Sequence, residues 1–233
     1  MSIDFLSEFR IREGEVDIRQ ARWYIIAASA LTAAAAGEHV GELYRQVTTG
    51  LPLEDRKIVQ RRIKEALLKA SILCGVPRSA VAFSALYAIL PEDEIDTYSP
   101  RTEKFNNPGD EQRRAERGRK YFDTLWGGPS GGQAQRDRAS KYYPDVYLLN
   151  IKTNYELWMS EDAILSNIET QLCNVALLIC NNSPTQMLWH LNGLLRHGAT
   201  REEAQFAQDL ALAVARQFNA KTGDITKIED LKL

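Results

Sequence analysis

Residues 169–195, which read ETQLCNVALLICNNSPTQMLWHLNGLL, decide the fold. The first part of this stretch is almost continuously apolar, as expected of a buried helix. Ser183-Pro184 then places an N-cap residue before a proline, which is typical of the start of a new helix. In the second part Met187, Leu191 and Leu194 recur at the spacing that lines one helical face. The stretch therefore predicts a hairpin of two helices.

An earlier stretch, residues 63–89, has the same layout and reads IKEALLKASILCGVPRSAVAFSALYAI. At one constant offset, Cys74 aligns with Cys180 and Phe83 aligns with Trp189. In both stretches an apolar helix ends at the cysteine, a turn containing proline follows, and an amphipathic helix with an aromatic residue begins. We therefore expect a duplicated helical hairpin at the core of the fold.

Helical periodicity fills most of the remaining chain, and no run of alternating β-branched residues predicts a strand. The sequence thus predicts an all-α bundle, a single compact domain in three parts. These are an N-terminal helical half (1–90), a loop-rich connection with one helix (91–135) and a C-terminal half (136–233). Helices are expected over about 16–47, 53–73, 79–89, 111–125, 160–181 with Ser160 as N-cap, 184–198, and 200–218.

Composition limits the class of protein. The chain has 233 residues, of which 44% are apolar and 26% charged, and its formal net charge is −2. A nucleic-acid binder is normally basic, so this charge argues against that class. Three cysteines without a secretory signal argue against a disulfide scaffold. The longest apolar stretch, Trp23–Ala36, is shorter than the ~20 residues that span a bilayer. We expect a cytoplasmic protein with no nucleic-acid or membrane partner.

The last three residues, Leu231-Lys232-Leu233, are similar to the peroxisomal address S-K-L. Leu231 stands where that signal has a small residue. Peroxisomal import is therefore the alternative to a cytoplasmic location.

Two residues of the C-terminal hairpin suggest chemistry. A helix turns by about 100° per residue, so Glu169 shares one stripe with Cys173 and Cys180 among apolar neighbours. His190 lies on the apolar stripe of the next helix. An antiparallel hairpin places these stripes opposite each other. Because burial raises a carboxyl pKa toward the working pH, a Glu169–His190 pair can relay a proton.

Purely structural roles are the alternative for these residues. His190 can be a hydrogen-bonded core residue, and its pair with Glu169 can be purely structural. His197 is expected near a helix C-terminus, where the helix dipole favours a cation. The cysteine spacings match no zinc pattern, and the chain has no Walker-A, GxGxxG or GxSxG motif. We therefore expect no metal and no cofactor.

Three runs carry a family resemblance together with the Glu169 helix: ERGRKYFDTLWGG (116–128), YPDVYLL (143–149) and WHLNGLLRHGATREE (189–203). The chain resembles the carboxymuconolactone decarboxylase-like family, which includes the alkylhydroperoxidase AhpD-like proteins. The resemblance covers about residues 112–216. It implies an AhpD-like helical bundle that assembles as a homo-oligomer, either a dimer, a trimer or a hexamer.

The resemblance also implies a cofactor-independent carboxy-lyase or isomerase acting on a small-molecule substrate, an unsaturated keto or lactone acid. His190 would be the general acid or base, and Glu169 would orient it or relay its proton. The pocket residues implied are Cys173, Cys180, Trp189 and Arg196. The peroxidase branch of the family uses a CxxC motif, whose second cysteine is replaced here by Ser183. A one-cysteine thiol antioxidant using Cys180 is the alternative, and a non-catalytic helical oligomer is the third hypothesis.

Overall fold

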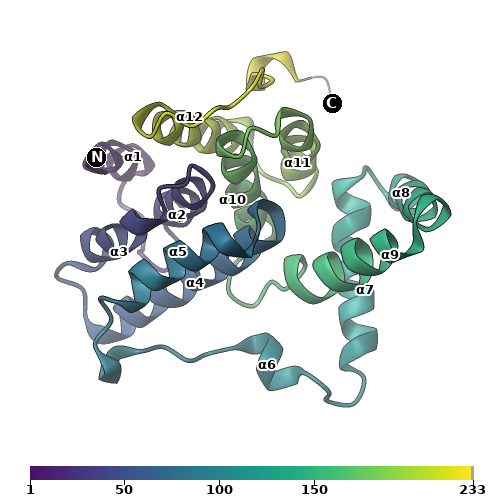
Figure 1. The fold of residues 1–233 in the computed structure, drawn as a ribbon, viewed down its shortest axis with the longest axis horizontal. Coiled ribbons are helices and arrows are strands. Elements are labelled where there is room, and N and C mark those ends of the chain that lie inside the picture. Colours follow the sequence, from purple (N-terminus) through teal and green to yellow (C-terminus); the bar gives the residue numbers. More distant parts are fainter. Residues whose placement is uncertain (232–233) are drawn as a thin grey trace.

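The computed structural model describes residues 1–231, and every element in that range is helical (Figure 1). The predicted all-α class is therefore confirmed. The α-helices are α1 (Leu6–Glu13), α2 (Trp23–Ala33), α3 (Val40–Thr48), α4 (Leu53–Cys74), α5 (Val76–Tyr87), α6 (Pro100–Lys104), α7 (Asp110–Leu125), α8 (Pro129–Tyr142), α9 (Pro144–Tyr147), α10 (Asn167–Cys180), α11 (Pro184–Arg196) and α12 (Arg201–Gln217). Three 3₁₀ segments, η1 (Gly37–His39), η2 (Glu92–Glu94) and η4 (Ile228–Asp230), and one π-helix, η3 (Leu148–Met159), complete the described part. Within it, no helix combines the length and apolarity needed to cross a membrane.

Helix α10 lies at the centre of the fold, where α2, α4, α11 and α12 pack around it (Figure 1). Every residue from Thr170 to Cys180 is buried, so this helix has no solvent face over most of its length. A helix that is apolar on all sides is stable only inside a core. The Ala-rich helix α2 is buried throughout as well, and its small side chains let the two helices pack closely.

The two similar stretches both form helical hairpins. Helix α4 ends at Cys74 and α5 begins at Val76, whereas α10 ends at Cys180 and α11 begins at Pro184. Gly75 makes the shorter turn possible, because its φ of +90° lies in the region that L side chains rarely adopt. Helices α4 and α10 pack against each other, so the two hairpins share one core.

Helices α7, α8, α9 and η3 form a group beside this core (Figure 1). η3 packs along α7 at Gly118, where an added Cβ atom would lie 2.7 Å from Cα of Glu156. The wide turn of the π-helix is shown by the amide of Ser160, which donates to the carbonyl of Tyr155 five residues back at 3.1 Å. The group contacts the core through α7 against α11 and η3 against α4.

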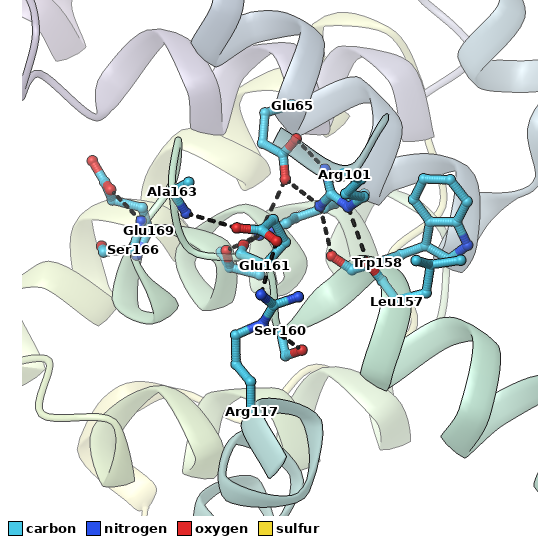
Figure 2. A network of polar contacts seen from close by, with 12 residues as sticks. Glu65, Arg101, Arg117, Leu157, Trp158, Ser160, Glu161, Ala163, Ser166 and Glu169 are labelled. Carbon is cyan, nitrogen blue, oxygen red and sulfur yellow. Dashed lines mark hydrogen bonds and ion pairs between the residues drawn. The ribbon is translucent and has the colours of Figure 1, made fainter. Parts of the chain in front are cut away.

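A buried ion network links this group to the core (Figure 2). Arg101 of α6 donates to both carboxylate oxygens of Glu65 on α4, at 2.9 and 2.6 Å. The same guanidinium donates to the carbonyls of Leu157 and Trp158 in η3, at 3.0 and 2.7 Å. Lys69, one turn after Glu65, places Nζ 3.4 Å from the Glu65 carboxylate. One arginine thus joins α4, α6 and η3.

Arg117 and Glu161 extend the network to α7. Nη1 of Arg117 lies 2.9 Å from Oε2 of Glu161, and Nε donates to the hydroxyl of Ser160 at 3.3 Å (Figure 2). The carbonyl of Glu161 accepts from Nζ of Lys69 at 2.7 Å. The segment between η3 and α10 is therefore held from both sides, by α4 and by α7.

Two helix boundaries differ from those that the sequence predicts. The expected helix over 16–47 is interrupted, because Ala35 adopts a φ of +59° between α2 and η1. Ser160 is not the N-cap of α10. That role belongs to Ser166, whose hydroxyl accepts from the amide of Glu169 while the Glu169 carboxylate accepts from the amide of Ser166.

Candidate functional site

His190 lies on the buried face of α11, between Met187 and Leu194. Its Nδ1 atom lies 2.9 Å from Oε1 of Gln171 on α10. The amide nitrogen of Gln171 in turn donates to the hydroxyl of Tyr121 on α7, at 2.8 Å. Since an amide oxygen only accepts, this chain places the imidazole proton on Nδ1 and leaves a lone pair on Nε2.

The imidazole of His190 is neutral at neutral pH. Burial lowers the pKa of His190 to about 4, and nearby His197 lowers it further by a smaller amount. Within residues 1–231 the Nε2 atom has no hydrogen-bond partner. A neutral imidazole with an unpartnered nitrogen is able to accept a proton from a molecule bound beside it.

A cavity of about 730 Å³ adjoins His190. It lies between the core helices α4, α10 and α11 and the group formed by α7, α8, α9 and η3. Its aromatic lining residues are Phe122, Trp126, Tyr142, Tyr143, Tyr155 and Trp189. The rings of Trp126 and Trp189 lie 5.3 Å apart at the wall, and Trp189 remains 41% exposed. These walls suit a planar, largely apolar molecule.

One charged side chain lines the cavity, that of Arg138 on α8, which is exposed and makes no ion pair within the described residues. The residues that line the cavity include no aspartate or glutamate. The Nε1 atom of Trp126 is buried without a partner in residues 1–231 and therefore does not face the cavity. A carboxylate is the group that matches the guanidinium of Arg138.

Glu169 does not pair with His190, and this expectation is corrected by the structure. Its carboxylate lies 2.5 Å from Nη2 of Arg62 on α4 and closes the capping box at Ser166. The residue that meets His190 is Gln171, two positions later. Two residues are about 200° of helical rotation, so Glu169 and Gln171 lie on opposite sides of α10.

Three of the four expected pocket residues lie away from the cavity. Cys180 is buried, with Sγ 3.3 Å from the carbonyl of Ala211, and Cys173 is buried between α10 and α2. Burial raises the pKa of each thiol to about 12. Arg196 donates to the carbonyl of Leu125 at 2.7 Å and lines a different pocket. Trp189 lines the cavity itself.

The residues that the sequence did not indicate are Gln171, Tyr121 and Arg138. Gln171 carried a signal, because a polar residue within a completely buried helix needs a hydrogen-bond partner. Tyr121 and Arg138 lie on α7 and α8, and their nearness to His190 follows only from the packing of distant helices. No group of three or more His, Cys, Asp or Glu side chains in the described part is placed to hold a metal ion.

Comparison with known proteins finds two relatives, and both have the same name. The chain is 28% identical to Peroxisomal protein 2 of Schizosaccharomyces pombe over 167 residues, 70% of this chain and 74% of that protein. It is 24% identical to Peroxisomal protein 2 of Saccharomyces cerevisiae over 196 residues, 76% of this chain and 67% of that protein. No family model and no solved structure matches.

These comparisons correct the family assignment. The resemblance to the carboxymuconolactone decarboxylase-like family is wrong, because the relatives carry another name and no family model matches the chain. The chemistry that the resemblance implied depended on a Glu–His pair. The structure gives its two members different partners, Arg62 for Glu169 and Gln171 for His190.

Proposed function

We propose that this chain is a cofactor-independent enzyme that moves a proton on a small organic acid, in an isomerase or lyase reaction. The observation that supports it is the neutral, buried His190, whose Nε2 has no partner in the described part and which lines an aromatic cavity. The unpaired Arg138 in the same lining suits the carboxylate of such an acid.

The neutral state of His190 favours proton abstraction as the first step. Nε2 takes a proton from a carbon next to a carbonyl, and the electron pair of the broken C–H bond moves into the carbonyl to give an enolate. The imidazolium then returns its proton to another carbon, which completes an isomerisation. A decarboxylation would need His190 to begin protonated, which its lowered pKa opposes, so isomerisation is the reaction that the site favours.

Gln171 and Tyr121 act as positioning residues in this proposal. The Gln171 oxygen holds the Nδ1 proton, and this directs the Nε2 lone pair away from α10. Glu169 has no part in it, because its carboxylate is engaged by Arg62. A non-catalytic helical oligomer, the third hypothesis, needs no cavity beside His190, whereas a cavity lined by His190 is present.

The test is exchange of a carbon-bound proton in D₂O, followed by ¹H NMR. The substrates are a panel of α-keto acids and unsaturated lactone acids, with 2-oxobutanoate as the first probe. We expect His190→Gln to lower the exchange rate by about 10²-fold or more. His39→Gln is the matched control, because His39 lies between Glu42 and Phe218. Equal exchange by the His190→Gln and wild-type proteins would refute the role of His190.

We also infer that the chain is peroxisomal, which is the alternative to the cytoplasmic location. Both relatives carry a peroxisomal name. The similar tripeptide 231–233 lies partly outside the described residues, since Lys232 and Leu233 are not described. A fluorescent protein fused to the N-terminus is expected to co-localise with a peroxisomal marker, and a diffuse signal would contradict the inference. A second fusion lacking 231–233 tests whether these residues form the address.

A further inference from the structure

The cavity beside His190 is also lined by Tyr155 of η3, whose hydroxyl makes no hydrogen bond within residues 1–231. Unlike Nε1 of Trp126, the hydroxyl oxygen of Tyr155 is not fully buried. Polar groups inside a protein are nearly always bonded to protein or to water. The Tyr155 hydroxyl is therefore available to a molecule bound in the cavity.

The ring of Tyr155 is held next to the residues that position His190. It packs edge-on against Phe122, with ring centroids 4.7 Å apart, and its centroid lies 6.1 Å from that of Tyr121. The Tyr121 hydroxyl accepts from Gln171, whose amide oxygen accepts from Nδ1 of His190. One hydrogen-bonded chain and one ring contact thus connect the two residues, and both line the same cavity.

The backbone that carries Tyr155 is fixed on both sides of the cavity wall. The next residue, Glu156, packs closely on Gly118 of α7, where an added Cβ atom would lie 2.7 Å from its Cα. The carbonyl of Leu157 accepts from Arg101 at 3.0 Å (Figure 2). π-Helical turns such as those of η3 are rare and occur frequently at functional sites. The phenol therefore projects from a rigid and unusual segment.

The other hydroxyl groups of the cavity are less suited to bind a buried anion. Among residues 1–231 they belong to Tyr142, Tyr143 and Ser183. Tyr142 and Tyr143 are 76% and 58% exposed, so water competes for their hydroxyls. The Ser183 hydroxyl donates to the carbonyl of Asn181 at 3.3 Å. A donor stabilises developing charge most where water is excluded, which selects Tyr155.

We propose that the Tyr155 hydroxyl is the hydrogen-bond donor to the negatively charged oxygen of the molecule bound beside His190. This inference rests on the proposed proton transfer. When Nε2 of His190 takes a proton from carbon, the electron pair of the C–H bond moves to the carbonyl oxygen, and the hydroxyl of Tyr155 donates to that oxygen. Arg138 is left to bind the carboxylate of the same acid.

The phenol keeps its own proton throughout. Burial raises the pKa of Tyr155 above its ordinary value of 10. The hydroxyl therefore remains a neutral donor and shares its proton with the enolate oxygen without transferring it. The proton that leaves the carbon is carried by His190 alone, so the exchange reaction needs one base and one hydrogen-bond donor.

The first test repeats the exchange assay in D₂O with Tyr155→Phe, which removes the hydroxyl and keeps the ring. We expect kcat for the exchanging acid to fall by about 10²-fold with little change in KM, because the lost contact forms with the enolate. Tyr87→Phe is the matched control, since Tyr87 is exposed on α5 and does not line the cavity. The urea midpoint of Tyr155→Phe should equal that of the wild type, because the lost hydroxyl has no partner in the described part.

The second test needs no turnover. Binding of 4-nitrophenolate, a planar anion with one ionised oxygen, is followed by its visible absorbance at a pH where it is ionised in water. We expect the wild type to bind it and Tyr155→Phe to bind it about tenfold more weakly, since a hydrogen bond to a charged oxygen is lost. Tyr87→Phe should bind it as tightly as the wild type does.

The two proposals fail separately. Equal kcat of Tyr155→Phe and wild type, with slow exchange by His190→Gln, would overturn the role of Tyr155 and leave that of His190. Absence of 4-nitrophenolate binding by the wild type, or equal affinity of Tyr155→Phe, would also overturn it. A wild type that exchanges no proton but binds 4-nitrophenolate through Tyr155 would refute the proposed function and support Tyr155 as the donor to a bound anion.

Discussion

Replacing Glu65 with glutamine removes the carboxylate that lies between Arg101 and Lys69. Burial acts to raise the pKa of the Glu65 carboxyl, but Lys69 and Arg101 outweigh it and hold the pKa below its ordinary value. The carboxylate is therefore charged in the folded protein. Glutamine keeps the volume and one acceptor oxygen, so the change removes charge with little change in packing.

The size of the effect follows from burial. The side chains of Arg101 and Lys69 are 8% and 1% exposed, so water cannot replace the lost carboxylate. Loss of one partner of a buried ion pair costs about 3–5 kcal/mol. Because glutamine retains a neutral acceptor for Arg101, we expect the lower end, about 3 kcal/mol, in the free energy of unfolding.

The variant should also respond differently to pH. Burial lowers the pKa of Lys69 below 10.5, and the Glu65 carboxylate opposes this fall. Without that carboxylate the pKa of Lys69 falls further. Between the folded and unfolded pKa values of Lys69, the unfolded chain binds more protons than the folded one. The free energy of unfolding of Glu65→Gln should therefore rise from pH 7 to pH 9 more steeply than that of the wild type.

Urea unfolding followed by circular dichroism measures both effects. Glu54→Gln on the same helix is the control, since Glu54 is exposed, and it should stay within about 0.5 kcal/mol of the wild type. Adding Lys69→Met to Glu65→Gln removes the uncompensated ammonium and should recover part of the loss. A Glu65→Gln protein within about 1 kcal/mol of wild type, with an unchanged pH dependence, would refute the reasoning.

Three further outcomes are expected. In the native protein at pH 8, Cys180 should resist a maleimide while the half-buried Cys74 reacts first, because burial raises the pKa of Cys180 to about 12; mass spectrometry of the labelled peptides decides this. Gly118→Ala should destabilise the fold by about 1–3 kcal/mol in urea, since the added methyl group overlaps Glu156. The ring of His190 should stay neutral in an NMR titration down to pH 5. Its folded pKa of about 4 lies below the ordinary 6.5, so the stability that neutral His190 contributes is fully present above pH 6.5 and is lost as the pH falls from 6.5 toward 4. A titration midpoint near 6.5 would contradict this.

The sequence was most informative where local signals agree. The helices expected to start at Pro184 and near Thr200 lie where the sequence places them, because proline and the capping box of Thr200 and Glu203 act on their own helix. Helix α8 was not predicted. It begins at Pro129 and includes two glycines in its first turns, and its stability comes from packing, since Gly132 fits closely against Asp123 of α7.

The candidate site was predicted only in part, because the sequence does not show which side of α10 faces His190. Periodicity places His190 on a buried face, but it cannot say which residue of a fully buried helix lies opposite. From Thr170 onward α10 is buried on all sides, so the apolar pattern that led to Glu169 does not identify Gln171 as the partner of His190. Arg62, which takes up the Glu169 carboxylate, lies on a helix more than a hundred residues away in the chain. That pairing depends on tertiary packing, which no local pattern reports.

The π-helix η3 has a consequence for how the length of this chain can vary. Because its amides bond five residues back, a turn within residues 148–159 contains one residue more than an α turn. Deletion of one residue there can be absorbed when the wide turn tightens, and the helices on either side keep their orientation. The same deletion in α10 would rotate every later side chain by about 100° and bring Gln171 or Cys180 out of register. Among related chains, single-residue gaps should therefore collect in 148–159 and be absent from α10.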